Sequence, residues 1–303
     1  MARPFADRLL RPERVAIVGA SGDVKKNNSR PQRYLRKHGF TGTIYPINPG
    51  YKELFGEPCY ASLADCPEPP DHAYVMLGTN SVVEAIRDCG KAGVAAATIF
   101  AGGFAEGGEA GKARQAALIA AAREGGVRLI GPNSLGVINT HWPLTLSANA
   151  VLERERLPKG RTGLVSQSGS MIGALVSRGE ARGIGFSTLV SIGNECDLTV
   201  GEIASMLVDD PDTDVILLFL ETMRDPVGVA EMARKAHKAG KPVMAYVLGR
   251  SDLGQALAQS HTGAMVGETR ALDAFLSDCG IMRLDHFESL IEAPLLLKGR
   301  KPA

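Results

Sequence analysis

One histidine set among small residues is the group in this sequence best suited to carry chemistry. His261 lies in the stretch 259–267, which reads Gln-Ser-His-Thr-Gly-Ala-Met-Val-Gly. Neutral imidazole is nucleophilic at physiological pH, and small neighbours allow a bulky phosphate or acyl group to approach it. The structural alternative is that His261 only caps a helix beginning near Ala264, which is the commoner role for an arbitrary histidine.

Three other polar positions follow expected strands in the same half of the chain. Glu221 ends the apolar run 215–220, where a carboxylate is well placed to hold a histidine tautomer or an imidazolium. Ser168 and Gly169 open a helix, where free N–H groups and the helix dipole favour an anion, although Ser168 is equally well explained as an N-cap. Asn194 lies in the loop after strand 187–192. These side chains and His261 could converge on one phosphate.

The elements that position these residues alternate between strands and helices. Such alternation predicts an open parallel α/β sheet, whose ligands bind outside the carboxyl ends of its strands. In the second half we expect strands at 163–166, 187–192, 215–220, 242–248 and 281–284. We expect one helix that is opened by residues 167–170, a second that ends at about residue 208, and two more at 269–279 and 287–297. In the first half we expect strands at 14–18, 43–47, 73–77, 95–100 and 127–130, with helices at 81–91 and 111–124.

The loops after the first-half strands contain glycine, asparagine or serine and should face one crevice. The first of them, Gly-Ala-Ser-Gly at 19–22, allows the backbone to approach a phosphate closely. The full GxGxxG spacing is absent, so the loop indicates a nucleotide-containing ligand and is weak support for NAD. An ordinary turn would use the same glycines. The loop 131–136, with Pro132 between glycines, is either an ordinary turn or part of the same crevice edge.

Length and composition set the domain count and the compartment. A chain of 303 residues predicts two domains, and the stretch 140–160 looks irregular, so we expect domains at 1–145 and 160–297 with a tail at 298–303. Thirty-four basic against thirty-three acidic residues argue against nucleic acid as a partner. Apolar runs are too short for a membrane span of ~20 residues. Five cysteines without a CxxC pair or zinc spacing, and no signal peptide, predict a soluble cytoplasmic protein without a metal site.

Seven short motifs occur in an order that resembles a known superfamily. They are Gly-Ala-Ser-Gly at 19–22, Ile-Asn-Pro at 47–49, Gly-Pro-Asn-Ser at 131–134, Ser-Gln-Ser-Gly at 166–169, Ser-Ile-Gly-Asn at 191–194, Asp-Asp-Pro at 209–211 and Ser-His-Thr-Gly at 260–263. From about residue 10 to residue 297 the sequence resembles the α side of the NDP-forming acyl-CoA synthetases, the superfamily of succinyl-CoA synthetase and ADP-forming acetyl-CoA synthetase.

The resemblance implies a fold and a set of site residues. The fold would be α/β, a Rossmann-like CoA-binding domain followed by a flavodoxin-like, doubly wound domain. His261 would be phosphorylated transiently, Glu221 would steady the phosphohistidine, and phosphate or substrate would be held by Ser134, Ser168, Gly169 and Asn194. Coenzyme A would bind at Gly19, Ser21, Gly22, Asn48, Pro49, Lys52, Gly78, Thr79, Asn80, Ala101, Gly102 and Asn133. Relatives often carry a basic residue where this chain has Gly50, and Lys52 could replace it.

The implied activity is that of an acid-thiol ligase. It interconverts acyl-CoA, NDP and phosphate with carboxylic acid, CoA and NTP, through an acyl phosphate and phospho-His261. ADP or GDP would bind with Mg on an ATP-grasp part, and no such segment is visible in these 303 residues. We therefore expect a β subunit or further C-terminal domains, within an oligomer.

Two alternatives to this activity differ in what the chain binds and whether it reacts. A non-catalytic regulatory module would bind CoA or acyl-CoA without phosphorylation. An NAD(P)-dependent oxidoreductase is disfavoured, because the strand after the first loop ends in Asn48 and Pro49 instead of an acidic ribose ligand.

Overall fold

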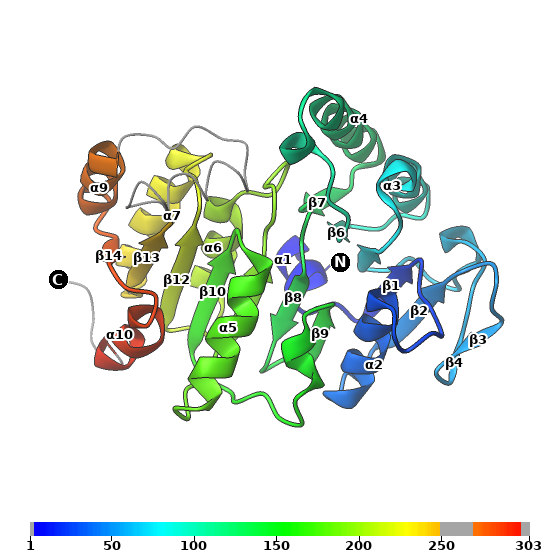
Figure 1. Ribbon diagram of the computed structural model, residues 1–303, viewed down its shortest axis with the longest axis horizontal. Helices are drawn as coiled ribbons and strands as arrows, with labels where there is room; N and C mark the ends of the chain where they lie inside the picture. Colours follow the sequence, from blue (N-terminus) through cyan, green and yellow to red (C-terminus); the bar gives the residue numbers. More distant parts are fainter. Residues whose placement is uncertain (1–2, 249–268, 298–303) are drawn as a thin grey trace.

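The computed structural model describes residues 3–248 and 269–297, which form two sheets covered by helices (Figure 1). The five-stranded sheet belongs to the first part of the chain, and the seven-stranded sheet to the rest. The expected α/β class is confirmed, as a parallel sheet followed by a second, mostly parallel one.

The first sheet is parallel throughout, with the strand order β2-β1-β5-β6-β7. Its strands are β1 (Arg14–Val18), β2 (Thr43–Ile47), β5 (His72–Val75), β6 (Ala96–Ile99) and β7 (Arg128–Ile130). Its helices are α1 (Phe5–Leu10), α2 (Arg30–Lys37), α3 (Val82–Lys91) and α4 (Glu109–Gly125), with 3-10 turns at Asn27–Ser29, Leu63–Asp65, Thr79–Ser81 and Ala105–Gly107. Sequence patterns did not predict α2 or the small hairpin of β3 (Glu53–Leu54) and β4 (Glu57–Pro58).

The second sheet has the order β14-β13-β12-β10-β11-β8-β9 and is parallel except around β8. Its strands are β8 (Gly136–Asn139), β9 (Leu144–Ser147), β10 (Thr162–Ser166), β11 (Thr188–Ser191), β12 (Val215–Leu220), β13 (Val243–Val247) and β14 (Met282–Leu284). Its helices are α5 (Gly169–Glu180), α6 (Val200–Asp209), α7 (Pro226–Lys238), α9 (Thr269–Asp278) and α10 (Ser289–Leu297), with a 3-10 turn at Ala150–Glu153.

The chain passes from one sheet to the other between β7 and β8. The stretch 140–160, which we expected to be irregular, contains β9 and a 3-10 turn. The antiparallel hairpin β8–β9 extends the edge of the second sheet beside β11. Composition misses this hairpin because its strands are only four residues each, too short for a periodic pattern.

Apolar side chains cover both faces of the second sheet. Ile172, Leu175 and Leu290 bring α5 and α10 onto one face, while Ile203, Met232 and Leu276 bring α6, α7 and α9 onto the other. The latter cluster continues through β8 and β9 to one face of the first sheet. The two sheets therefore share buried core, and their loops keep a fixed relation.

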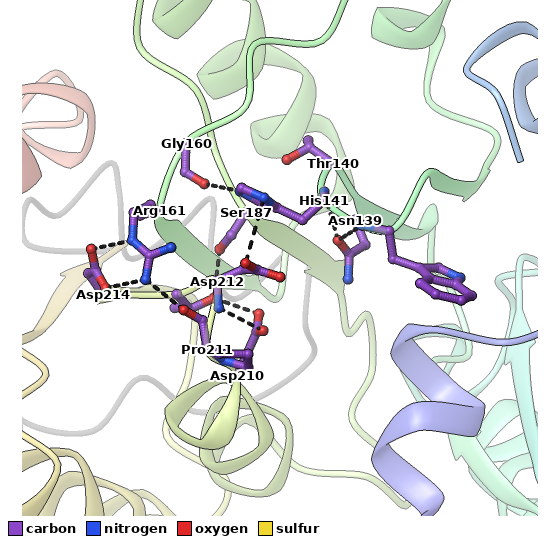
Figure 2. A network of polar contacts seen from close by, with 12 residues as sticks. Asn139, Thr140, His141, Gly160, Arg161, Ser187, Asp210, Pro211, Asp212 and Asp214 are labelled. Carbon is purple, nitrogen blue, oxygen red and sulfur yellow. Dashed lines mark hydrogen bonds and ion pairs between the residues drawn. The ribbon is translucent and has the colours of Figure 1, made fainter. Parts of the chain in front are cut away.

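A polar network lies at the amino-terminal ends of the parallel strands of the second sheet, opposite to their carboxyl ends (Figure 2). The carboxamide oxygen of Asn139 accepts hydrogen bonds from the backbone N–H groups of His141 and Trp142, at 3.1 and 2.9 Å. Nε2 of His141 lies 2.7 Å from the carbonyl oxygen of Gly160. Asp210, one of the motif residues 209–211, pairs with Arg11 of the first domain at 2.5 Å. The Asp-Asp-Pro motif thus joins the domains and lies away from the carboxyl-end loops.

Within the described ranges, no helix combines the length and the apolar character that crossing a bilayer requires. All five cysteines are free thiols.

Candidate functional site

A cavity of about 240 Å³ lies at the carboxyl ends of β10, β11 and β12. Four loops wall it, each following a different strand, and the loop after β7 comes from the first domain. The lining residues are Asn133, Leu135, Gln167, Ser168, Gly169, Ser170, Gly193, Asn194, Glu221, Thr222 and Arg224. The structure therefore brings together Asn133, Ser168, Gly169, Asn194 and Glu221, which the sequence analysis had selected separately.

The amino-terminal end of α5 forms one wall of this cavity. Ser168 occupies the N-cap position, but its side chain makes no capping hydrogen bond. Its hydroxyl oxygen lies instead 3.2 Å from that of Ser170, which also lines the cavity. The first backbone N–H groups of a helix have no partners within the helix, and the dipole favours negative charge there. This wall is suited to an anion such as phosphate.

Glu221 follows β12 directly, has only 8% of its surface exposed, and is one of the residues that line the cavity. Its backbone N–H donates to the carboxamide oxygen of Gln167 at 2.6 Å, and Thr222 donates to the same oxygen at 2.9 Å. A buried carboxylate at the end of a central strand is held by the rigid sheet behind it. It can therefore hold a cationic or N–H-bearing partner at a fixed position.

Glu195 is a second buried carboxylate, one residue beyond the lining residue Asn194. One of its carboxylate oxygens accepts from Nε2 of Gln167 at 2.8 Å and the other from the backbone N–H of Val200 at 2.6 Å. Burial raises the pKa of Glu195, and these two hydrogen bonds oppose the rise. The side chain supports the cavity from behind.

The loop from the first domain is interlocked with the loop after β11. Gly193 has a φ of +61°, and a Cβ there would lie 2.2 Å from the carbonyl oxygen of Pro132, so glycine is required. Asn194 donates through its backbone to Pro132 at 2.9 Å and through its side chain to Glu106 of the first domain. Asn194 is thus a link between the domains as well as a lining residue.

Ser134 has a different position from the one we expected. It is fully buried, and its hydroxyl donates to the carbonyl oxygen of Ser191 at 2.5 Å and accepts from the backbone N–H of Gly136 at 3.0 Å. The hydroxyl is therefore committed to the join between the loop and β11. Its neighbours Asn133 and Leu135 line the cavity, and the role of Ser134 in holding phosphate stays a prediction.

A second and larger cavity, about 610 Å³, lies at the carboxyl ends of β1 and β2 and beside the start of α3. The strand order reverses between β1 and β5, which is where open α/β sheets bind ligands. Of the expected CoA-binding residues it is lined by Gly19, Asn48, Pro49 and Asn80. Asn48 shapes its edge, because its side chain donates to Ala20 at 2.8 Å and accepts from Gly50 at 2.8 Å.

Contacts between neighbouring loops connect this crevice to the first cavity. Asn80 lines the crevice, and its neighbour Thr79 donates to the carbonyl oxygen of Gly102 at 2.8 Å. Ala101, next to Gly102, accepts a hydrogen bond at 2.9 Å from the backbone N–H of Asn133, a lining residue of the smaller cavity. The two cavities therefore lie on one continuous edge of the molecule.

The other expected CoA-binding positions stand outside the lining of both cavities. The hydroxyl of Ser21 accepts from Asp23 at 3.1 Å, which closes the first loop, and Gly22 packs against Tyr51 and Leu54. Lys52 is exposed at the start of the small hairpin. Gly78, Thr79, Ala101 and Gly102 are also absent from both linings and lie in the loops between the two cavities.

His261 lies outside the described residues, so its role stays a prediction. Among the residues that the structure describes, no group of three His, Cys, Asp or Glu side chains is arranged to hold a metal ion.

Comparison with known proteins identifies both halves of the chain. Residues 13–140 match the CoA binding domain family, and residues 159–297 match the family described as succinyl-CoA ligase like flavodoxin domain. The chain belongs to the NDP-forming acyl-CoA synthetase superfamily.

Individual relatives agree with this assignment. Over 97% of its length the chain is 36% identical to acetate–CoA ligase (ADP-forming) I of Archaeoglobus fulgidus, of which it covers 42%. It is 31% identical to the α subunit of acetate–CoA ligase (ADP-forming) II of Pyrococcus furiosus, and this match covers 94% of the chain and 61% of that subunit. Among solved structures, dinucleotide forming acetyl-coenzyme A synthetase 1 of Candidatus Korarchaeum cryptofilum, in complex with phosphate and ADP, has a TM-score of 0.86 at 32% identity, with coverages of 94% and 61%. The chain thus spans about 40 to 60% of the length of these relatives.

The sequence analysis did not select three residues that support or line the smaller cavity. Gln167 and Glu195 support the cavity, and Arg224 is the one basic side chain among the described lining residues. Gln167 lies inside the motif 166–169, and Glu195 directly follows the motif 191–194. No pattern in the sequence distinguishes a buried polar residue at such a position from an exposed one. Arg224 follows the end of β12 by four residues, and only the turn after Glu221 brings it to the cavity.

Proposed function

We propose that this chain is the CoA-binding and phosphohistidine-bearing part of an NDP-forming acyl-CoA synthetase. The observation that carries the proposal is the smaller cavity, which is lined by the uncapped start of α5 and by the acidic residue Glu221. One wall favours a phosphate anion, and the other favours an imidazole that gains positive charge. A phosphohistidine needs both.

The larger crevice fits the adenosine end of coenzyme A. Apolar side chains such as Val18, Leu63 and Leu77 offer a surface for a purine, and the carboxylates of Glu84 and Asp88 suit ribose hydroxyls. The same carboxylates would repel phosphates, so we place the pyrophosphate toward the glycine loop 19–22. The pantetheine arm would then run from Asn80 toward Asn133, along the loops between the two cavities. When bound, coenzyme A supplies the thiol that carries the acyl group.

The proposed reaction proceeds in three reversible displacements. A phosphate oxygen bonds to the acyl carbon of acyl-CoA, and the thiolate leaves, which gives an acyl phosphate. An imidazole nitrogen of His261 then bonds to phosphorus, and the carboxylate leaves as the free acid. Finally the terminal oxygen of a nucleoside diphosphate takes the phosphoryl group and restores His261. Glu221 would stabilise the imidazolium, and the start of α5 would hold the phosphoryl oxygens.

The final transfer requires a nucleotide site, which we place on an ATP-grasp subunit or on further domains. The share of the relatives' length that this chain covers supports such a partner. ADP or GDP would bind there with Mg, and the assembly would be an oligomer.

The test is chemical and uses the chain together with its ATP-grasp part and ATP labelled on the γ-phosphate. The expected product is protein-bound label that is labile in acid and stable in base. His261→Ala should abolish it, and His237→Ala, at an exposed position on α7, should retain it. Label that persists in His261→Ala would overturn the proposal. A regulatory module would instead bind coenzyme A and take no label in the unsubstituted protein.

A further inference from the structure

Behind the smaller cavity, two buried polar side chains form a bridge between three of its loops. Gln167 follows β10, Glu195 follows β11, and Glu221 with Thr222 follows β12. Gln167 and Glu195 are only 7% and 8% exposed. We propose that Gln167, oriented by Glu195, is the positioning residue that fixes Glu221 at the cavity wall. The chemical role of Glu221 in this inference rests on the proposed function.

The carboxamide of Gln167 uses its full hydrogen-bonding capacity in this bridge. Its oxygen accepts from the backbone N–H groups of Glu221 and Thr222, at 2.6 and 2.9 Å. Its nitrogen donates to Glu195 at 2.8 Å and to the carbonyl oxygen of Thr222 at 2.9 Å. A primary amide offers two acceptor and two donor sites, so none is left over. The turn after β12 is therefore held at three points by one side chain.

Glu195 fixes which way this amide faces. Its carboxylate only accepts hydrogen bonds when ionised, so the nitrogen of Gln167 must point toward it and the oxygen toward β12. Glu195 itself has a φ of +55°, which is uncommon for a residue with a side chain. Its second oxygen is held by the backbone N–H of Val200 at the start of α6. The surrounding structure must hold this buried carboxylate in its unfavourable backbone conformation, which points to a functional role.

The rival explanation is that Gln167 is ordinary structural support, and the chain contains a matched control for it. Asn139 is also buried, accepts from two consecutive backbone N–H groups and donates to a carbonyl, that of Leu10 at 3.2 Å (Figure 2). It lies at the opposite end of β11, paired with Thr188, away from the cavity. Loss of either amide removes similar hydrogen bonds, and only one loss should disturb Glu221.

The first experiment compares Gln167→Ala with Asn139→Ala in the complex with the ATP-grasp part. The rate of phosphorylation of His261 should fall about 10- to 100-fold in Gln167→Ala, as when a supporting partner of a functional ligand is removed. The KM for acyl-CoA should change less than about threefold, because its adenosine end binds elsewhere. Asn139→Ala should lose comparable stability and keep the rate. Equal rates in the two variants would overturn the inference.

Changing the charge of the amide tests the role of Glu195. Gln167→Glu places two carboxylates at hydrogen-bonding distance, so the pair must share a proton and the rate should recover as the pH is lowered. Exchanging the two residues, as Gln167→Glu with Glu195→Gln, restores an amide donor facing a carboxylate and should recover part of the rate at pH 7. A double variant no faster than Gln167→Glu alone would contradict the bridge.

A readout that needs no activity separates this inference from the proposed function. Hydrogen exchange at the backbone amides of Glu221 and Thr222 should accelerate in Gln167→Ala and remain unchanged in Asn139→Ala. If the unsubstituted protein takes no label but these amides respond, the proposed function fails and the positioning role stands. If label appears and the amides do not respond, the positioning role is the part that fails.

Discussion

Gly169, the first residue of α5, lies directly against Leu135 in the loop that follows β7. A Cβ added to Gly169 would lie 2.6 Å from Cγ of Leu135, well inside van der Waals contact. The helix start of one domain and the loop arriving from the other therefore determine each other's position. The shape of the smaller cavity depends on this contact, since both residues line it.

Gly169→Ala should destabilise the protein by about 1–3 kcal/mol, the usual cost of overpacking a well-filled contact. Adding Leu135→Ala should recover part of that stability by removing the clash. Urea unfolding of the single and double variants measures both effects. Gly107→Ala is the control, because a Cβ there meets nothing within 4 Å. A single variant as stable as Gly107→Ala would contradict the contact.

Arg224→Ala should weaken the binding of inorganic phosphate to the cavity by roughly threefold to tenfold, because the exposed guanidinium adds attraction that solvent screens. Arg224→Lys should retain much of the affinity, since the charge remains. Calorimetry at low and high salt measures the effect, which should shrink at high salt. Lys235→Ala removes a charge that pairs with Asp209 on the helical face and should leave phosphate binding unchanged.

Gly19→Ala should lower the affinity for coenzyme A about tenfold. Gly19 has a φ of +88°, and a Cβ there would lie 2.7 Å from Leu77, which lines the same crevice. Gly39→Ala carries the same backbone strain, at φ +87°, with nothing within 4 Å, so it separates strain from obstruction of the crevice. Titration with coenzyme A and with NAD in parallel measures both affinities. Binding of NAD in place of coenzyme A would favour the oxidoreductase alternative.

His72 should make folding stability depend on pH between about 4 and 6.5. Its ring is fully buried between the carbonyl oxygen of Leu9 and the hydroxyl of Thr98, at 2.9 and 2.8 Å, and burial lowers the pKa of His72 to about 4. The unfolded chain then binds a proton that the folded chain excludes. Stability should therefore be intact above pH 6.5 and fall by about 3 kcal/mol as the pH approaches 4.

The measurement is the free energy of unfolding in urea at several pH values in this window. His72→Gln should show a shallower fall, because the titrating ring is gone, although it is less stable at pH 7. His237→Gln, an exposed position on α7, should reproduce the slope of the unsubstituted protein. Equal slopes for all three proteins would show that His72 is not responsible.

The strand and helix pattern of this chain could be read from its sequence where the elements are long and apolar. The run 215–220 is β12 to the residue, because a strand covered on both faces must be apolar throughout. The helix α2 was not predicted, since it carries four basic residues and only Pro31, Gln32, Tyr34 and Leu35 are buried. These residues are buried because α2 packs against β9, a strand remote in the sequence. A pattern within residues 30–37 cannot indicate that contact.

The sequence by itself determined which loops would lie together, because residues at the carboxyl ends of parallel strands must gather at one edge. It selected Ser168, Asn194 and Glu221 for that reason. Tertiary structure alone decided that Ser134 turns inward, that Asn194 reaches Glu106, and that Gln167 and Glu195 meet behind Glu221. Those outcomes depend on distances between segments remote in the chain, and a residue's type and its neighbours contain no information on such distances.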